Sequence, residues 1–301
     1  MTDDRRYDAA LLLVVLIWGL NFPIIKVPLE AMHPFTVNLF RFAVSVLTLG
    51  GLWAHRARAL GVPFFRVLRQ NPGAVVGLAL LGHVGYQVLF ILGIARTGAG
   101  SAALIIASSP AWTALGGHVT RIERLRPIQW LGLTLSFAGV FVVVLYGEKT
   151  VDFSAEALTG NLLLLAGAAF WGLYTVFSRP VLGRGLPPLS LTFFSVLLAM
   201  PVLAALGLST MPQTVWTDVG ASDWGALLFS GGLSTGLAYY LWNIGVRAVG
   251  PSQTAAFNNL VPFVALVAAF VMLGEPITLP QVGGGLLIVG GLVVMRRVAL
   301  Q

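Results

Sequence analysis

Four apolar stretches of the chain each carry aromatic and polar side chains at spacings of three and four residues. They contain Trp18, Asn21 and Phe22; His83, Tyr86 and Gln87; Trp171, Tyr174 and Thr175; and Tyr239, Trp242 and Asn243. In a helix these spacings place the members of each set on one face. Aromatic rings stack on planar solutes, and a few amides or hydroxyls orient the bound molecule. The four sets predict a cavity that binds a planar or aromatic solute, and Asn258 in a later stretch adds a further amide.

The apolar surroundings of these side chains limit where they can point. Hydrophobic residues make up 57% of the 301 residues and charged residues only 10%, whereas a soluble globular protein is about one-quarter charged. Lipid must therefore be the solvent of this chain. A histidine or glutamine that faced acyl chains would stay unpaired, so we expect His83 and Gln87 to face the interior of a helical bundle. Hydrogen bonding between helices, without any ligand contact, is the alternative role for each residue.

Arg41 is the only charged residue that lies well inside an apolar stretch. Counted from Pro34, seven residues at a rise of 1.5 Å place it about 10 Å deep in the membrane. Its guanidinium either snorkels outwards or binds the carbonyls of a helix end, or it attracts the carboxylate of a substrate. The sequence leaves both interpretations open.

Two prolines and two glutamates recur at equivalent places. Pro110 follows a pair of serines, and Pro262 follows a pair of asparagines. Proline interrupts helical hydrogen bonding, so Pro110 and Pro262 are candidate gating bends or, equally, static kinks. Glu123 and Glu275 come just after the same two stretches. We expect these glutamates to cap or pin helix ends rather than to relay protons.

The sequence lacks the residue patterns of enzymes and metal sites. It has no cysteine, no GxSxG, HExxH or P-loop motif, and four histidines without metal-ligand spacing. We therefore expect no catalytic residue, no metal and no cofactor. No aspartate or glutamate lies well inside an apolar stretch, and His83 is the one histidine placed to carry a proton. This pattern favours uniport down a gradient, or coupling through a device that these residues do not reveal, over proton coupling by intramembrane carboxylates.

The fold class predicted by these patterns is an all-α integral membrane protein with ten transmembrane helices. Each spanning helix needs about 20 mostly apolar residues. The ten stretches cover about 9–27, 34–54, 73–95, 101–119, 128–146, 160–178, 188–208, 224–246, 251–273 and 278–296. The longest connection, about 55–72, carries four arginines and is expected to lie as an amphipathic segment on the membrane surface.

The chain is built twice from one unit. The tripeptide Trp18-Gly19-Leu20 recurs as Trp171-Gly172-Leu173 at an offset of 153, and glycines 132 and 139 recur as glycines 284 and 291 at an offset of 152. The halves, residues 1–150 and 151–301, each contain five spans, so the second half must enter the membrane from the opposite side. Inverted repeats around a central cavity are typical of secondary transporters and also occur in some channels.

The positive charges predict the orientation in the membrane. With the N-terminus inside, 14 of the 18 lysines and arginines fall in inner segments and 3 in outer ones. Positive loops mark the cytoplasmic side, so both termini are expected to be cytoplasmic. The net charge of +7 then fits a lipid bilayer rather than nucleic acid as the partner. The sequence does not distinguish a monomer from a homodimer.

The chain resembles members of the EamA-type, ten-helix branch of the drug/metabolite transporter superfamily, because its short motifs occur in the same order and are duplicated in the same way. The resemblance covers nearly the whole chain and rests on the two Trp-Gly pairs, Arg41-Phe42, Ser108-Pro110, Asn259-Pro262 and Gly274-Glu275-Pro276. The first half departs from the last motif with Ile122-Glu123-Arg124. The resemblance implies a bacterial inner-membrane exporter of small metabolites, often amino acids, with spans five and ten at the periphery. The aromatic sets make the chain similar to the YddG-type aromatic amino-acid exporters.

The sequence therefore predicts a carrier that exports amino acids, aromatic ones in particular, or related metabolites by alternating access. A multidrug exporter of hydrophobic compounds, indifferent to Arg41, is one alternative. A passive channel, without saturation or counterflow, is the other.

Overall fold

The computed structural model describes residues 2–60, 72–122, 126–146 and 155–297, and all elements in these ranges are helices. Six helical runs are long and apolar enough to cross a membrane: Arg6–Leu29, Pro34–Arg56, Pro72–Ile94, Ala155–Gly183, Pro188–Gln213 and Pro251–Leu273. Two shorter apolar helices, Pro127–Val143 and Leu279–Gly291, and the passes at 99–119 and 221–249 complete ten. The all-α fold with ten helical passes is confirmed.

The first half supplies five of these passes. They are α1 (Thr2–Leu29), α2 (Pro34–Leu60), the continuous run of α4 (Pro72–Leu78), η1 (Ala79–Gly85) and α5 (Tyr86–Ile94), the pair α6 (Ala99–Ile106) and α7 (Ser109–Val119), and α8 (Pro127–Tyr146). The amphipathic segment predicted at 55–72 lies mostly outside the described residues.

The second half repeats this order. Its passes are α9 (Ala155–Gly183), α10 (Pro188–Thr210) with the short η2 (Met211–Gln213), the run of α11 (Ala221–Leu228), η3 (Phe229–Leu237) and α12 (Ala238–Val249), the run of α13 (Pro251–Ala255), η4 (Ala256–Leu260) and α14 (Val261–Leu273), and α15 (Leu279–Arg297). The π-helical stretches η1 and η3 interrupt the same pass in each half. The internal repeat therefore extends to its irregularities.

The two predicted proline bends are helix starts. Pro110 is the second residue of α7, which begins after a break at Ala107 and Ser108, and Pro262 is the second residue of α14, which follows the 3-10 stretch η4. Proline is tolerated in a first turn because its missing N–H would have no helical partner there. Each proline therefore restarts a helix in the middle of its pass, and its part in gating stays a prediction.

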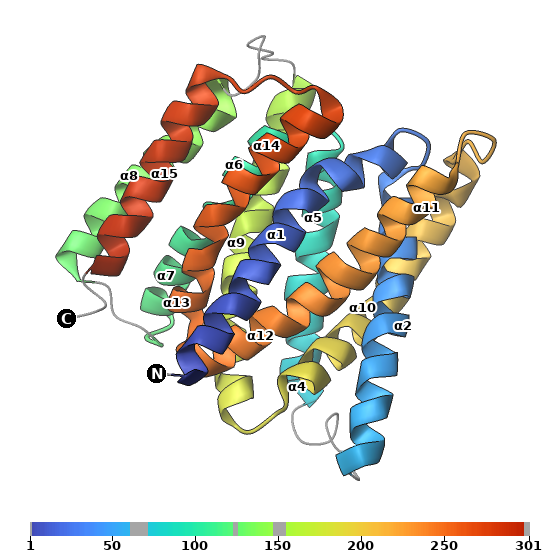
Figure 1. The fold of residues 1–301 in the computed structure, drawn as a ribbon, viewed down its shortest axis with the longest axis horizontal. Helices are drawn as coiled ribbons and strands as arrows, with labels where there is room; N and C mark the ends of the chain where they lie inside the picture. The colour runs from blue at the N-terminus through green and yellow to red at the C-terminus, as the bar shows by residue number, and fades with distance from the viewer. Residues whose placement is uncertain (1, 61–71, 123–125, 147–154, 298–301) are drawn as a thin grey trace.

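Helices α8 and α15 pack along each other at one edge of the bundle (Figure 1). Glycines make this close approach possible: a Cβ at Gly139 would lie 2.5 Å from the Gly284 carbonyl oxygen, and a Cβ at Gly291 would meet the Gly132 carbonyl. Residue 132 meets 291 while 139 meets 284, so the two helices run antiparallel. These glycines therefore serve packing within the chain, and the peripheral position implied for spans five and ten is confirmed.

The two halves interlock in the rest of the bundle. Helix α1 packs against α12 and α14 of the second half, and α9 packs against α5 and α7 of the first. The start of α1 and the end of α15 lie at the same end of the molecule (Figure 1), as ten passes require. The cytoplasmic location of that end stays a prediction.

Candidate functional site

A partly open cavity lies where the two halves meet, and it encloses about 490 Å³ of empty space when the space at its open side is included. Its wall comes from α1, α2, α5, α6, α9, η3, α12, η4 and α14. The lining residues are Trp18, Asn21, Phe22, Arg41, Tyr86, Gln87, Phe90, Ala103, Ile106, Ala107, Trp171, Ser234, Tyr239, Asn258 and Val261.

Eight of the ten predicted binding residues line this cavity. They are Trp18, Asn21, Arg41, Tyr86, Gln87, Trp171, Tyr239 and Asn258. The structure thus brings residues from both halves to one place, as the repeat predicted. Their contact with a substrate stays a prediction.

His83 and Tyr174 lie behind this wall. The His83 Nε2 atom is 2.9 Å from Ser195 Oγ, and its ring centroid lies 5.3 Å from that of Tyr174 and 5.4 Å from that of Tyr239. The Tyr174 hydroxyl accepts a hydrogen bond of 2.8 Å from Asn243 Nδ2. Both side chains are fully buried. In this conformation they support the rings of the cavity from behind rather than facing it.

The π-helical stretch η1 explains the different position of His83. It covers Ala79–Gly85, so it separates His83 from Tyr86 and Gln87, which stand in α5. A π turn contains more residues than an α turn. The face predicted from α-helical spacing therefore does not continue from Tyr86 back to His83.

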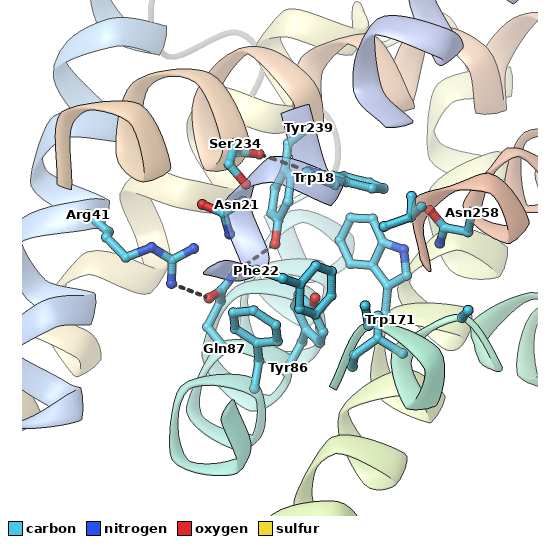
Figure 2. A pocket seen from close by; sticks show the side chains of 15 residues that line it. Trp18, Asn21, Phe22, Arg41, Tyr86, Gln87, Trp171, Ser234, Tyr239 and Asn258 are labelled. Carbon is cyan, nitrogen blue, oxygen red and sulfur yellow. Dashed lines mark hydrogen bonds between the residues drawn. The ribbon is translucent and has the colours of Figure 1, made fainter. Parts of the chain in front are cut away.

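The aromatic part of the wall centres on Trp171 (Figure 2). Its ring centroid lies 5.4 Å from that of Trp18, edge to face, 5.2 Å from that of Tyr86 and 4.9 Å from that of Tyr239. The indole Nε1 of Trp18 donates to the Ser234 carbonyl at 3.1 Å, so its position is fixed. Such a set of rings can bind a planar apolar group by edge and face contacts.

The polar part of the wall centres on Arg41, whose side chain is 1% exposed. Its Nε donates to Ser230 Oγ at 2.6 Å, and its Nη2 donates to Thr235 Oγ1 at 3.2 Å. Its Nη1 donates to Asn38 Oδ1 at 2.8 Å and to Gln87 Oε1 at 3.2 Å. The guanidinium does not snorkel to the surface and does not bind helix-end carbonyls, so that interpretation of Arg41 is wrong.

The partners of Arg41 are all neutral. No aspartate or glutamate in the described part of the chain pairs with it, and its Cζ lies 5.8 Å from the centre of the Phe90 ring. A buried charge without a counter-ion is costly. The arrangement orients the guanidinium without neutralising it, and an anionic ligand would supply the missing charge.

Hydrogen bonds and ring contacts connect the two parts of the wall. Gln87 accepts from Arg41 and donates through Nε2 to the Tyr239 hydroxyl at 2.5 Å, and Tyr239 contacts Trp171. Figure 2 shows Arg41, Gln87 and Asn21 on one side of the cavity and Trp18 and Trp171 on the other. The site can therefore bind a molecule with an anionic end and an aromatic end.

The Trp-Gly pairs that open the two halves have two separate tasks. Both tryptophans line the cavity. Both glycines face the interrupted pass of the other half: a Cβ at Gly172 would lie 2.8 Å from the Thr113 nitrogen in α7, and a Cβ at Gly19 would clash with Val264 in α14. The glycines let α1 and α9 approach the interrupted passes closely, and this places the tryptophans.

The breaks of these interrupted passes also reach the cavity. Asn258 in η4 donates through Nδ2 to Ser109 Oγ at the start of α7, at 3.0 Å. Ile106 and Ala107 at one break and Val261 at the other complete the wall. Broken helices at mid-membrane expose backbone polar groups where they line a cavity.

Sequence reasoning missed part of the Arg41 environment. Asn38 lies one helical turn before Arg41, and that spacing could have revealed it. Ser230 stands in the π-helical η3 of the other half, and no spacing rule connects it with α2. The Ser234 carbonyl is a backbone group, which side-chain patterns do not indicate.

Glu275 caps a helix of the opposite half. Its Oε1 accepts from the Ala99 nitrogen at 2.9 Å and its Oε2 from the Gly100 nitrogen at 3.2 Å, at the start of α6. A carboxylate at a helix N-terminus satisfies free N–H groups and complements the helix dipole. The predicted capping role is confirmed for Glu275, whereas Glu123 lies outside the described residues.

Comparison with known proteins places the chain among membrane transporters. The model of the EamA-like transporter family matches it twice, over residues 5–145 and 158–297. A probable terminal-alkyne amino-acid exporter of Streptantibioticus cattleyicolor is 31% identical, with 96% of this chain and 93% of the relative covered. A probable amino-acid metabolite efflux pump of Salmonella typhimurium is 29% identical, with 96% and 94% covered.

A solved crystal structure shares the fold. It superposes with a TM-score of 0.71 at 23% sequence identity, over 97% of this chain and 99% of the other.

Proposed function

Because the chain belongs to the EamA-like transporter family, we propose that this multi-pass membrane transporter exports amino acids, above all aromatic ones, or closely related metabolites. Export proceeds by alternating access through the cavity between the two halves. The protein works in a bacterial inner membrane with both termini in the cytoplasm. The protein is a transporter and not an enzyme, because it belongs to this family. The lack of enzyme motifs in the sequence agrees with this but does not carry the conclusion.

The environment of Arg41 is the observation that supports a carboxylate-bearing substrate. A guanidinium that is 1% exposed, lines the cavity and has only neutral partners is suited to a carboxylate, which it binds with short charge-assisted hydrogen bonds. An exporter of hydrophobic drugs would gain nothing from it, because an uncompensated buried charge disfavours apolar and cationic solutes. The Arg41 environment therefore supports a carboxylate-bearing substrate over this alternative.

The rings support an aromatic side chain on that substrate. Trp171 contacts both Trp18 and Tyr86, and the two tryptophans lie on the side of the cavity away from Arg41 (Figure 2). A carboxylate at Arg41 and a ring among these residues describe an aromatic amino acid. The names of the relatives from Streptantibioticus and Salmonella, which refer to amino-acid export, agree with the class.

The repeat supports alternating access over a passive channel. The antiparallel crossing of α8 and α15, with glycine 132 on 291 and glycine 139 on 284, supports a two-fold relation between the halves. In transporters with inverted repeats, two oppositely oriented halves exchange conformations around a fixed midplane site. The cavity lies between the halves, as this mechanism needs.

Uniport is the coupling that the side chains support. In the described spans no carboxylate faces the cavity, and His83 lies behind its wall. Proton-coupled carriers commonly place such groups on the transport path. The substrate gradient then drives export.

The proposed function is tested by uptake of labelled amino acids into proteoliposomes of the purified protein. The panel contains phenylalanine, tryptophan, leucine and serine, each with and without a pH gradient. Saturable uptake that is fastest for the aromatic pair and indifferent to the gradient supports the proposal. No uptake of any of them, from protein shown to be folded, would overturn the amino-acid assignment.

A further inference from the structure

Asn21 presents an unused hydrogen-bond acceptor to the cavity. Its side chain is 4% exposed and lines the cavity, and its Oδ1 atom has no hydrogen-bond partner. The other buried unpartnered side-chain atoms of the described residues belong to residues outside the cavity wall. A buried amide oxygen without a donor is unfavourable, and such an atom in a binding site marks the place of a ligand donor.

The position of Asn21 matches one group of an amino acid. Figure 2 shows its amide between Arg41 and Trp18, at the polar side of the cavity. A substrate with its carboxylate at Arg41 and its ring among the tryptophans has its α-ammonium group next to the carboxylate. An ammonium donates three hydrogen bonds and accepts none. Arg41 repels it, which leaves a neutral oxygen as the acceptor.

We propose that Asn21 Oδ1 accepts a hydrogen bond from the α-ammonium group of the substrate, and so selects amino acids against 2-oxo acids. The inference rests on the proposed function and deepens it. A 2-oxo acid keeps the carboxylate for Arg41 and the ring for Trp171 but leaves the Asn21 oxygen unpaired. A site built to hydrogen-bond a group rejects the analogue that lacks it.

The test is competition with labelled phenylalanine for uptake into proteoliposomes. In the wild-type protein, unlabelled phenylalanine is expected to compete at least tenfold better than phenylpyruvate. Asn21→Leu keeps the size of the side chain and removes the acceptor, so the preference falls to near unity. Asn21→Asp keeps an acceptor oxygen at this position, so the preference for phenylalanine is expected to be retained. Asn259→Leu is the matched control, because Asn259 also has a buried unpartnered oxygen but does not line the cavity.

Each outcome decides one claim. No uptake of phenylalanine or any other amino acid overturns the proposed function itself. The role of Asn21 alone is overturned if the wild-type protein takes up phenylalanine but phenylpyruvate competes equally well. It is also overturned if Asn21→Leu keeps the preference for phenylalanine over phenylpyruvate. The wild-type comparison needs no variant to fold.

A second inference comes from a difference between the two halves. In the second half, hydrogen bonds close α9 onto α12. Asn243 Nδ2 donates to the Tyr174 hydroxyl at 2.8 Å, Trp242 Nε1 donates to Thr175 Oγ1 at 3.3 Å, and Arg179 Nη1 donates to the carbonyl of Val246 at 2.7 Å. Arg179 also donates to the carbonyl of residue 247. These bonds run along the interface to the end of α12.

The equivalent helices of the first half, α1 and α5, share no hydrogen bond between their described residues and meet through the rings of Phe22 and Phe90, whose centroids lie 5.9 Å apart. The offsets of 153 and 152 relate Tyr174 to Asn21 and Trp242 to Phe90, and both counterparts line the open cavity. Arg179 corresponds to Lys26, which makes no hydrogen bond to any described residue and is only half-buried. The carbonyls that correspond to its partners are those of Ile94 and Ala95, at the end of α5, where helical carbonyls have no helical partner.

We infer that Arg179 latches the closed side of this conformation, and that Lys26 forms the equivalent latch in the opposite one. When α9 leaves α12, α1 closes onto α5 and the Lys26 ammonium donates to the carbonyls of Ile94 and Ala95. The release of the Arg179 hydrogen bonds is thereby coupled to the formation of the Lys26 hydrogen bonds at the opposite end of the transport path.

Disulfide crosslinking tests the exchange, because the chain has no native cysteine. The pair Lys26→Cys and Ala95→Cys is expected to crosslink slowly in the wild-type background and several-fold faster with Arg179→Gln, which removes the latch. Arg56→Gln is the matched control, since Arg56 joins α2 to the Tyr240 hydroxyl of α12 and makes no hydrogen bond to α9, so it should leave the rate unchanged. A crosslinking rate that Arg179→Gln does not raise, while the protein still transports, overturns the inference.

Discussion

Trp18 and Trp171 occupy the same position in the two halves of the chain, and their rings meet edge to face with centroids 5.4 Å apart. Gln87 and Tyr239, 152 residues apart, are also repeat counterparts and share a hydrogen bond. A residue touches its own counterpart only near the axis that relates the two halves. The inverted repeat predicted from the sequence would place its two-fold axis at these contacts, and it would then account for a single central site in a duplicated sequence.

Replacing Arg41 should abolish recognition of the carboxylate. A hydrogen bond to a charged group contributes about 1.5–3 kcal/mol, or about 10- to 150-fold in affinity. Arg41→Gln should therefore raise the half-saturating phenylalanine concentration by about this factor, measured by uptake into proteoliposomes. Arg56→Gln, a change on the exposed surface, should have no effect. Unchanged affinity in folded Arg41→Gln would contradict the role of Arg41.

Replacing Trp171 should weaken aromatic substrates selectively. Each aromatic contact contributes about 0.5–1.5 kcal/mol beyond buried area, and Trp171 is the centre of the ring cluster. Trp171→Ala should lower phenylalanine affinity by about tenfold and leucine affinity less. Trp130→Ala removes a ring that is 41% exposed, outside the cavity, and should change neither. An equal loss for both amino acids would argue against stacking.

The α8 and α15 crossing should tolerate no side chain at Gly139. A Cβ there would lie 2.5 Å from a carbonyl oxygen, and overpacking costs about 1–3 kcal/mol. Gly139→Val should lower the melting temperature of the detergent-solubilised protein. At Gly283 nothing lies within 4 Å of an added Cβ, so Gly283→Ala should melt like the wild type. Equal melting of the two variants would refute this packing.

Removal of the Glu275 carboxylate should destabilise the start of α6. Loss of a cap costs about 0.5–2 kcal/mol, and Glu275 accepts hydrogen bonds from two backbone nitrogens. Glu275→Ala should lower the melting temperature, and Glu275→Gln, which keeps one acceptor oxygen, should lower it less. Transport at a temperature well below melting should remain, because Glu275 does not line the cavity. Loss of transport from stable Glu275→Gln protein would instead point to proton coupling.

Much of the fold and of the cavity wall follows from sequence. The apolar stretches predict the passes because lipid demands them, and the offset of the Trp-Gly pairs predicts the repeat. Convergence of Trp18, Tyr86 and Trp171 then follows from the symmetry of the repeat rather than from any local pattern.

The rest depends on backbone geometry that spacing rules do not contain. The π-helical η1 rotates His83 away from the face of Tyr86, and η3 brings Ser230 and Thr235 to Arg41. The partners of Arg41 are neutral side chains from α2, α5 and the other half. Only the assembled bundle distinguishes a guanidinium oriented towards a cavity from one that snorkels.

Trans-stimulation of export tests the central claim most directly. Proteoliposomes are preloaded with unlabelled tryptophan, with tryptamine, which lacks the carboxylate, or with buffer, and uptake of labelled tryptophan is followed. A carrier that binds the carboxylate at Arg41 and exchanges conformations around one site predicts faster uptake with internal tryptophan and no acceleration with tryptamine. Uptake that is linear in concentration and indifferent to preloading would indicate a channel, and equal acceleration by tryptamine would contradict recognition of the carboxylate.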